Sequence, residues 1–455
     1  MAGGTWLSQN KVRPGAYINF KAVPKSSMTV GDRGIVAIGL SLNWGKENDL
    51  IEVLSTDMLD GSSKKLIGFD AFSPESKLLA GALKYCYKAL VYRMDNGSTK
   101  ASVKIGNLTC TAKYAGTFGN NILVAIIENE SLFDVVTYVN GETVDSQKVS
   151  TISELENNDY VVFSGTGALE ANAGSALTGA TSGTTSETTA YPSMFAKLKM
   201  AKWQVFICNS SDVSIKSNVV SFINQLRNDE GKYVQGVIPN YDGADDEGII
   251  NSVSSVVIDG VTFSVEEFTS VVGGLTAGAN FNESNTAKVI AGATSIVNEM
   301  NDAEIKNALK SGKFVISTSA DGSKVKVEQD INSLHTFTKE KNYAFSKNRV
   351  LRTLDEIGTT TKITWEETYE GKVDNDETGR GIFKDDLVAY GTELQRLRGI
   401  QEFNGSDDIS VVQGNDLDSV LVDWLVKPVD SMEKLYMQVS VNSWYFTVNV
   451  SCVNL

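Results

Sequence analysis

The chain has 455 residues, which is too long for one compact core, so two to four domains are expected. Apolar residues make up 42% and charged residues 21% of the sequence, a profile typical of folded soluble proteins and not of disordered ones. Its 41 basic and 56 acidic side chains give a formal net charge of -15, which excludes nucleic acids and anionic membranes as expected partners. Residues 1–19 lack the apolar core of a signal peptide, so the sequence predicts a protein kept in a cytoplasm until it is released.

The first predicted element is a strand near the N-terminus. Residues 12–20 alternate between apolar and polar side chains with the period of two that a strand requires. Pro14 favours an edge strand, or a strand that is added to the sheet of a partner. A buried strand is predicted over 34–39, a helix over 50–58, and a second helix that begins at Ser73. The apolar members of the N-terminal strand are Val12, Ala16, Ile18 and Phe20.

Between residues 94 and 190 the pattern predicts strands only. Asn140-Gly141 is the strongest hairpin signal in the chain, because both central residues of such a turn adopt positive φ angles. Residues 164–190 are rich in Gly, Ser, Thr and Ala, which predicts a mobile surface loop. From 191 to 345 strands and helices alternate again, so the sequence predicts an α/β core into which the β-only segment is inserted.

The last part of the chain is predicted to be α+β. Two helices are expected around 350–357 and 383–397, and two alternating runs follow, reaching almost to the last residue. A terminal amphipathic strand is not stable alone, because its backbone groups and its apolar face need a sheet to join. The pattern leaves open whether each end folds back onto its own domain or joins another molecule. The apolar members of the two runs are Leu435, Met437, Val439 and Val441, then Trp444, Phe446, Val448, Val450 and Cys452.

Side chains for catalysis and for metal binding are scarce. His335 is the only histidine, so a histidine relay would have to be built around it. The four cysteines lie far apart without a C-x-x-C pair and are predicted to be buried hydrophobic residues. Residues 374–385 resemble a calcium loop but depart from it at three positions, which favours a solvated loop between two helices. The acidic cluster 242–247 lies in one turn, whereas metal or phosphoryl chemistry would need carboxylates that converge from separate elements. From these observations together, no catalytic residue, metal or cofactor is predicted.

Six short segments carry a resemblance to a known family. They are 1–6 (MAGGTW), 11–20 (KVRPGAYINF), 33–36 (RGIV), 273–280 (GGLTAGAN), 327–334 (VEQDINSL) and 348–350 (NRV). These segments resemble the tail sheath proteins of contractile phages and of phage-tail-like bacteriocins from Gram-positive hosts. The resemblance spans nearly the whole chain and is most specific at the N-terminus, whereas the segment 94–190 contributes nothing to it.

The resemblance implies a structural sheath subunit and not an enzyme. Copies would stack in rings, commonly hexameric, to form a helical sheath around an inner tail tube, and contraction would drive the tube through the envelope of a target cell. The N- and C-terminal arms would add strands to the sheets of neighbouring copies, and the receiving sheet would include Leu435 to Val441. Charged side chains of the inner C-terminal domain would contact the tube. The candidates for that contact are Arg380, Lys384, Arg396 and Arg398.

The predicted organisation combines these observations. Its parts are an N-terminal linking arm (1–20), an α/β core (21–93 and 191–345), an inserted β-rich outer domain (94–190), a C-terminal α+β inner domain (346–441) and a C-terminal linking arm (442–455). Baseplate and tail terminator proteins are further implied partners, with no nucleic acid and no membrane insertion. The particle would assemble in the bacterial cytoplasm and leave by lysis. The main alternative is a non-contractile surface-binding or adhesin-type structural protein.

Overall fold

The computed structural model describes residues 2–4, 15–17 and 33–441. Near the N-terminus, β1 (Ala2–Gly4) pairs in parallel with β2 (Gly15–Tyr17), so the described part of the predicted N-terminal strand is extended and its partner is the start of the same chain. The remainder of that strand, with Val12, Ile18 and Phe20, lies outside the described residues. So does the whole predicted run from Trp444 to Cys452. The roles of both segments stay predictions.

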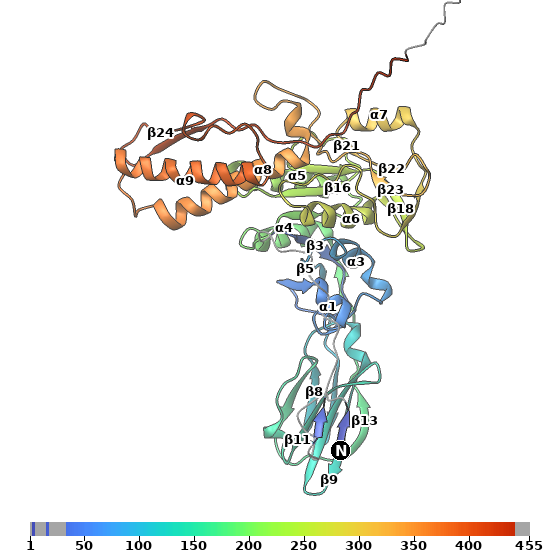
Figure 1. The fold of residues 1–455 in the computed structure, drawn as a ribbon. Coiled ribbons are helices and arrows are strands. Elements are labelled where there is room, and N and C mark those ends of the chain that lie inside the picture. The colour runs from blue at the N-terminus through green and yellow to red at the C-terminus, as the bar shows by residue number, and fades with distance from the viewer. Residues whose placement is uncertain (1, 5–14, 18–32, 442–455) are drawn as a thin grey trace, which may run out of the picture.

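A seven-stranded sheet forms the centre of the molecule (Figure 1). Six of its strands run parallel to their neighbours, and β4 at one edge runs antiparallel to β5. Helices α3 and α6 cover one face of the sheet, whereas α4 and α5 cover the other, so the strands are buried on both sides. In spatial order the strands are β21 (Lys313–Phe314), β17 (Ile249–Ser252), β16 (Gln235–Pro239), β15 (Val205–Ile207), β3 (Ile35–Leu40), β5 (Lys88–Arg93) and β4 (Leu50–Leu54). The helices are α3 (Lys77–Leu83), α6 (Val265–Gly278), α4 (Glu187–Leu198) and α5 (Val213–Asn224).

Glycines allow α6 to pack directly on the backbone of α3 and of the turn that follows it. A Cβ atom at Gly274 would lie 2.3 Å from the carbonyl oxygen of Ala82, and one at Gly278 would lie 1.9 Å from that of Tyr85. Real Cβ atoms do not approach so closely, so any larger residue would push the two helices apart. This packing gives a physical reason for Gly274 and Gly278 in the segment 273–280.

A β-sandwich interrupts the α/β body between β5 and α4, and it extends away from the body as a separate lobe (Figure 1). Apolar side chains from the facing sides of two sheets form its core. The predicted Asn140-Gly141 turn is confirmed, because these residues have φ angles of 51° and 83° and join β10 to β11. One sheet contains β11 (Glu142–Val149), β10 (Leu132–Val139), β9 (Ile122–Asn129) and β13 (Asn172–Ala176), and the other contains β12 (Val161–Gly165), β8 (Leu108–Ala112) and β7 (Ser102–Ile105).

Two segments differ from the sequence prediction. Residues 50–58 were expected to form one helix, but β4 occupies Leu50–Leu54 and α1 begins at Ser55, because the apolar residues of β4 join the edge of the central sheet. Residues 164–190 were expected to form a mobile loop, but they contain β13, whose small residues pair with β9. The buried side chains of Leu169 and Leu177 anchor this tract in the core of the sandwich.

Two helices and a hairpin form an extension on one side of the body (Figure 1). The first half of α8 (Asn348–Thr364) is buried in the body, whereas α9 (Glu377–Arg396) packs on the hairpin of β24 (Ile409–Gln413) and β25 (Val420–Trp424). The remaining elements are α1 (Ser55–Asp60), α2 (Lys64–Ile67), α7 (Asp302–Lys310), β6 (Asp95–Asn96), β14 (Thr184–Thr185), β18 (Ser255–Ile258), β19 (Val261–Phe263), β20 (Ala293–Val297), β22 (Ile316–Thr318) and β23 (Val325–Val327). Short 3-10 turns lie at Pro74–Ser76, Thr117–Asn121, Ile152–Glu154, Tyr343–Ser346 and Gly405–Asp407, and π turns at Gln225–Asp229 and Trp365–Tyr369.

Candidate assembly surfaces

The β-sandwich joins the central sheet beside the place where an α/β enzyme would bind its ligand. Ligands of open α/β sheets bind at the carboxyl ends of the strands, where the strand order reverses. The order reverses between β3 and β15. Beside this point, beyond the ends of β3 and β5, the buried carboxylate of Asp95 accepts hydrogen bonds from Ser41 Oγ (2.6 Å), the Leu42 N–H (2.5 Å) and Thr185 Oγ1 (2.6 Å). These bonds tie together the two strands that connect the body to the sandwich, so this carboxylate has a structural role.

Arg93 and Trp44 fasten the sandwich to the body. The fully buried guanidinium of Arg93 donates hydrogen bonds to the carbonyl oxygens of Gly45 (3.0 Å) and Ala115 (2.8 Å) and to Ser98 Oγ (2.7 Å). Trp44 follows β3 of the body, yet its ring is buried in the core of the sandwich. Residues from both lobes therefore share one buried junction.

His335 and the acidic turn 242–247 lie in contact with each other. His335 Nδ1 lies 3.3 Å from Asp245 Oδ1, and the backbone N–H groups of His335 and Thr336 also donate to that oxygen. Glu247 pairs with Lys341 at 2.5 Å, so the turn pins one loop against another. Asp385 lies inside α9, which shortens the predicted solvated loop. Among the described residues, no three His, Cys, Asp or Glu side chains are arranged to hold a metal ion.

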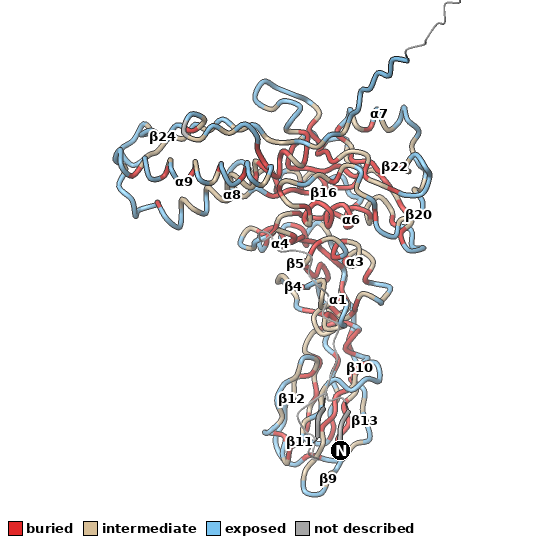
Figure 2. The backbone as a smooth tube through the Cα atoms, in the orientation of Figure 1, coloured by how far each residue is buried: buried red, intermediate tan, exposed pale blue. Residues whose placement is uncertain are grey.

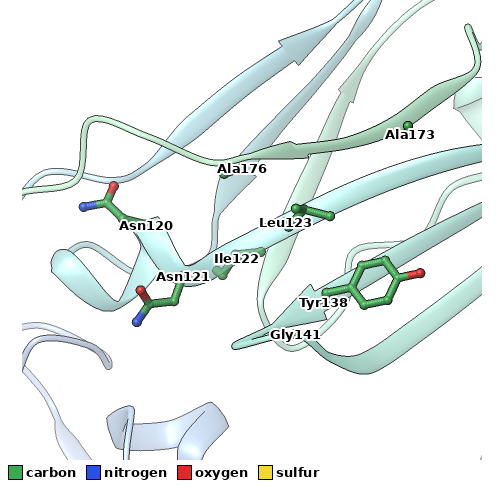
Figure 3. Close-up of a pocket in the computed structure, with 8 residues that line it drawn as sticks. All are labelled: Asn120, Asn121, Ile122, Leu123, Tyr138, Gly141, Ala173 and Ala176. Atoms are coloured by element: carbon green, nitrogen blue, oxygen red, sulfur yellow. The ribbon is translucent and has the colours of Figure 1, made fainter.

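One hollow lies on the β-sandwich, and its lining offers little chemistry (Figure 3). It has a volume of about 360 Å³. Tyr138 is the only titratable residue in the lining, which is otherwise made of amide and apolar side chains. The lining residues are Asn120, Asn121, Ile122, Leu123, Tyr138, Gly141, Ala173 and Ala176.

The described cysteines are buried, and their thiols are poor nucleophiles. Burial raises the pKa of the Cys86 and Cys110 thiols to about 12 and that of Cys208 to about 11. At pH 8 the thiolate fraction of each is then about 1 in 1,000 or less. We expect the variant C452S to show no reaction with a thiol reagent at pH 8 while it is folded, and to react at all its remaining cysteines in denaturant. The absorbance of the released reporter measures this, and a thiol that reacts rapidly in the folded protein would contradict it.

The hairpin of β24 and β25 has two open edges. The Leu425 N–H donates to Asp408 O and the Gly414 N–H donates to Ser419 O, which marks the hydrogen-bonded pairs at the two ends of the hairpin. Because such pairs alternate along an antiparallel ladder, Ser410–Asp423 and Val412–Leu421 are the hydrogen-bonded pairs between them. The other residues direct their backbone groups outward, without a hydrogen bond to any described residue. They are Ile409, Val411 and Gln413 on one edge and Val420, Val422 and Trp424 on the other.

The segment after the hairpin returns to the body and then leaves it. Gln401 and Lys427, then Gly399 and Val429, are joined by backbone hydrogen bonds of 2.9 Å each. Beyond residue 433 the chain is exposed and contains no strand as far as residue 441 (Figure 2). Figure 1 shows this segment leaving the molecule on the side away from the hairpin. Its large apolar side chains keep between 72% (Val439) and 89% (Tyr436) of their surface exposed.

The segment that was predicted to be part of the receiving sheet, Leu435 to Val441, therefore does not form a strand among the described residues. Leu435, Met437, Val439 and Val441 lie on the exposed segment and have no strand partner among the described residues. The hairpin of β24 and β25 was missed at the sequence level. Its signal is the alternation of Val420, Val422 and Trp424 with polar or exposed neighbours, after a turn that begins at Gly414.

The four basic residues proposed to contact a tube do not form one cluster. Arg380 donates to the carbonyl and side-chain oxygens of Asn375, and Arg396 pairs with Glu393 through two hydrogen bonds of 2.6 and 2.7 Å. Arg380 and Lys384 lie in the first half of α9, whereas Arg396 and Arg398 lie at or beyond its end. Since a helix rises about 1.5 Å per residue, roughly 24 Å separates Arg380 from Arg396.

Three family models match consecutive parts of the chain. The phage tail sheath protein beta-sandwich domain matches residues 96–182, the phage tail sheath protein central domain matches residues 183–333, and the phage tail sheath C-terminal domain matches residues 340–442. None of the helices in the described part of the chain is long and apolar enough to cross a membrane.

Individual proteins are similar over nearly the whole chain. The phage-like element PBSX protein XkdK of Bacillus subtilis is 33% identical over 97% of this chain and 100% of its own length. The crystal structure of the sheath tail protein of Desulfitobacterium hafniense is 37% identical, with a TM-score of 0.78, and the match covers 93% of this chain and 99% of that one. The helical sheath of the anti-feeding prophage in its contracted state shares the fold alone, at 10% identity and a TM-score of 0.53, with 94% of this chain and 99% of that one covered.

Proposed function

The chain belongs to the phage tail sheath protein family, and from this premise we propose that it is the structural subunit of a contractile sheath. Copies of the chain stack in rings around an inner tail tube and are linked by exchanged β-strands. Contraction of the lattice drives the tube through the envelope of a target cell. The subunit assembles in the cytoplasm of a bacterial host, contacts baseplate and terminator proteins at the ends of the tail, and leaves the cell by lysis.

One observation carries this proposal: among the described residues, the donor segment has no strand partner, the acceptor hairpin has two unfilled edges, and the two lie on opposite sides of the molecule. The donor is the exposed segment 434–441, with its row of apolar side chains. The acceptor is the β24–β25 hairpin, which offers three outward N–H groups and three outward carbonyl groups on each edge. A two-stranded sheet is marginal in water, so added strands would stabilise it. Because the segment leaves on the side away from its own hairpin, strand addition is favoured between copies (Figure 1).

Such an exchange is a heterologous contact, and it extends into a helix instead of closing as a dimer. Two open edges provide one place for a C-terminal arm (442–455, preceded by 434–441) and one for an N-terminal arm (1–20) from different neighbours. This assignment replaces Leu435–Val441 as the receiving sheet with β24 and β25. The extension that carries the hairpin is the part proposed to face the tube, with Arg380, Lys384, Arg396 and Arg398 as candidate contacts, and the β-sandwich is proposed to face outward.

Proline at an open edge tests the acceptor. Val411 and Val422 direct their N–H groups outward from β24 and β25, respectively. Proline removes that donor and blocks an incoming strand, but it is tolerated at an edge because no bond within the hairpin is lost. We expect V411P and V422P to remain folded and to lose polymer growth, as judged by electron microscopy of the purified chain. Wild type is expected to form striated tubes under the same conditions.

Alanine at the same positions is the matched control. The side chains of Val411 and Val422 pack against the core beneath the hairpin, so V411A and V422A lose comparable packing but keep the outward N–H. Both alanine variants should still form tubes. If both proline variants polymerise like wild type, the hairpin is not the receiving sheet. If wild type gives only monomers or closed oligomers at high concentration, the non-contractile alternative is favoured.

A further inference from the structure

Glu433 is the point at which the C-terminal segment is attached to the body before it leaves. Its Oε1 accepts a hydrogen bond from Thr286 Oγ1 (2.7 Å), and its Oε2 accepts one from Gln329 Nε2 (2.6 Å) and pairs with Lys347 Nζ. Only 11% of the Glu433 side chain and 4% of the Lys347 side chain are exposed. The residues on either side of it, Met432 and Lys434, are exposed. The segment is thus held by one side chain among exposed neighbours.

The partners of Glu433 come from three separate parts of the body. Thr286 lies in the loop after α6, Gln329 follows β23, and Lys347 immediately precedes α8. A carboxylate that accepts hydrogen bonds from all three fixes the position of the segment in three directions. The flanking side chains contribute less: Asp430 lies 3.9 Å from Lys347 Nζ, beyond hydrogen-bond distance, and Ser431 Oγ lies 3.5 Å from Glu433 itself.

The same polar contacts continue to α8, the helix that leads from the body into the extension with the hairpin. Thr286 Oγ1, which donates to Glu433, accepts a hydrogen bond from the Asp330 N–H (2.9 Å). The carboxylate of Asp330 in turn binds Arg352 Nη2 (2.7 Å) and Asn348 Nδ2 (2.9 Å), both on α8. The base of the donor segment and the base of α8, which leads to the extension with the acceptor hairpin, therefore meet in one hydrogen-bonded network.

We propose that Glu433 is a positioning residue that fixes the direction in which the C-terminal arm leaves the body relative to the receiving hairpin of the same copy. In a lattice linked by strand exchange, each copy gives an arm to one neighbour and receives an arm from another. The angle between these two connections sets how successive copies are placed. Glu433 sets this angle without contacting the neighbour. This inference rests on the proposed function, since it assigns a role to the arm that the function requires.

Pulsed electron–electron double resonance measures the distance between a spin label at the base of the arm and one on the body of the isolated chain. Spin labels are placed at N307C on α7 and M432C beside Glu433, where both native side chains are exposed, in a C452S background. E433A removes every contact of the carboxylate, whereas E433Q keeps the size of the side chain and one acceptor oxygen. The control K434Q changes the charge of the next residue, which is exposed. We expect the width of the distance distribution to increase at least about twofold in E433A, less in E433Q, and not in K434Q.

Electron microscopy of the unlabelled variants then separates the two proposals. If E433A releases the arm base and gives short, irregular or no polymers, while K434Q gives normal tubes, the positioning role is supported. A distance distribution in E433A as narrow as in wild type would overturn it, and so would tubes of normal length and regularity despite a released arm. Circular dichroism checks that E433A is folded, and E433Q supplies the comparison if it is not. The proposed function fails separately, if wild type forms no tubes or if chains without arms polymerise normally.

Discussion

Deletion of either terminal arm, residues 1–20 or 434–455, is expected to give a folded subunit that does not grow into tubes. Neither deletion removes a residue of the central sheet, the β-sandwich or the hairpin of β24 and β25. Each arm is proposed to add a strand to a neighbour, and each ladder hydrogen bond contributes about 0.5–1.5 kcal/mol. The loss of several bonds per link should raise the critical concentration for assembly by roughly 100-fold or more. Sedimentation of polymer over a range of protein concentrations measures this, and circular dichroism checks the fold.

A mixing experiment distinguishes a lost donor from a damaged subunit. A chain that lacks 434–455 keeps its hairpin, so it can still receive an arm but cannot give its own C-terminal arm. Added to wild type below equimolar amounts, it should join growing ends and shorten the tubes. The variant V422P combined with the same deletion has one blocked edge as well, and should shorten them less. Polymers of normal length from both truncated chains would contradict the role of the arms.

Local signals predicted much of the α/β body and of the sandwich. The turn at Asn140-Gly141 could be identified because its two positive φ angles are required by the turn itself. Residues 50–58 could not be assigned correctly, because their apolar residues fit a helix as well as an edge strand. Pairing with β5 makes residues 50–54 a strand, and this pairing is a tertiary contact. Small residues at 172–176 gave no strand signal either, since their pairing with β9 is a tertiary contact.

The assembly surfaces were predictable only in part. The alternation in Leu435 to Val441 indicates a strand, and no pattern can say whether its partner lies in the same chain. The structure exposes this segment, and it supplies the missed acceptor in β24 and β25. Glu433 carried no signal at all, because its partners Thr286, Gln329 and Lys347 lie between 86 and 147 positions away in the sequence. Such long-range polar contacts become visible only when the fold is known.

Arg352→Met is expected to destabilise the body by about 3–5 kcal/mol, because it leaves the buried carboxylate of Asp330 without its counter-charge. The side chains of Arg352 and Asp330 are 0% and 1% exposed, and their atoms Nη2 and Oδ2 lie 2.7 Å apart. Hydrogen–deuterium exchange with mass spectrometry measures the loss, with peptides of the β-sandwich as an internal reference that should not change. The double variant R352M/D330N should lose less than R352M alone, because the uncompensated charge is removed. An equal or larger loss in the double variant would show that charge is not the cause.

The same ion pair predicts how stability depends on pH. Burial acts to raise the pKa of Asp330, but the charge of Arg352 and hydrogen bonds from Asn285 and Asn348 outweigh it, so the pKa lies below its usual value. A carboxylate with a lowered pKa stabilises the folded state above its unfolded pKa of about 3.9, and this contribution is lost as the pH falls through the folded pKa. D330N lacks that contribution at every pH. We therefore expect the difference in unfolding free energy between wild type and D330N to be constant from pH 8 to about pH 5 and to shrink below about pH 4. Denaturant titrations at each pH measure the difference, and a gap that persists unchanged down to pH 2 would mean that the ionised form of Asp330 is not what stabilises the junction of α8 with the body.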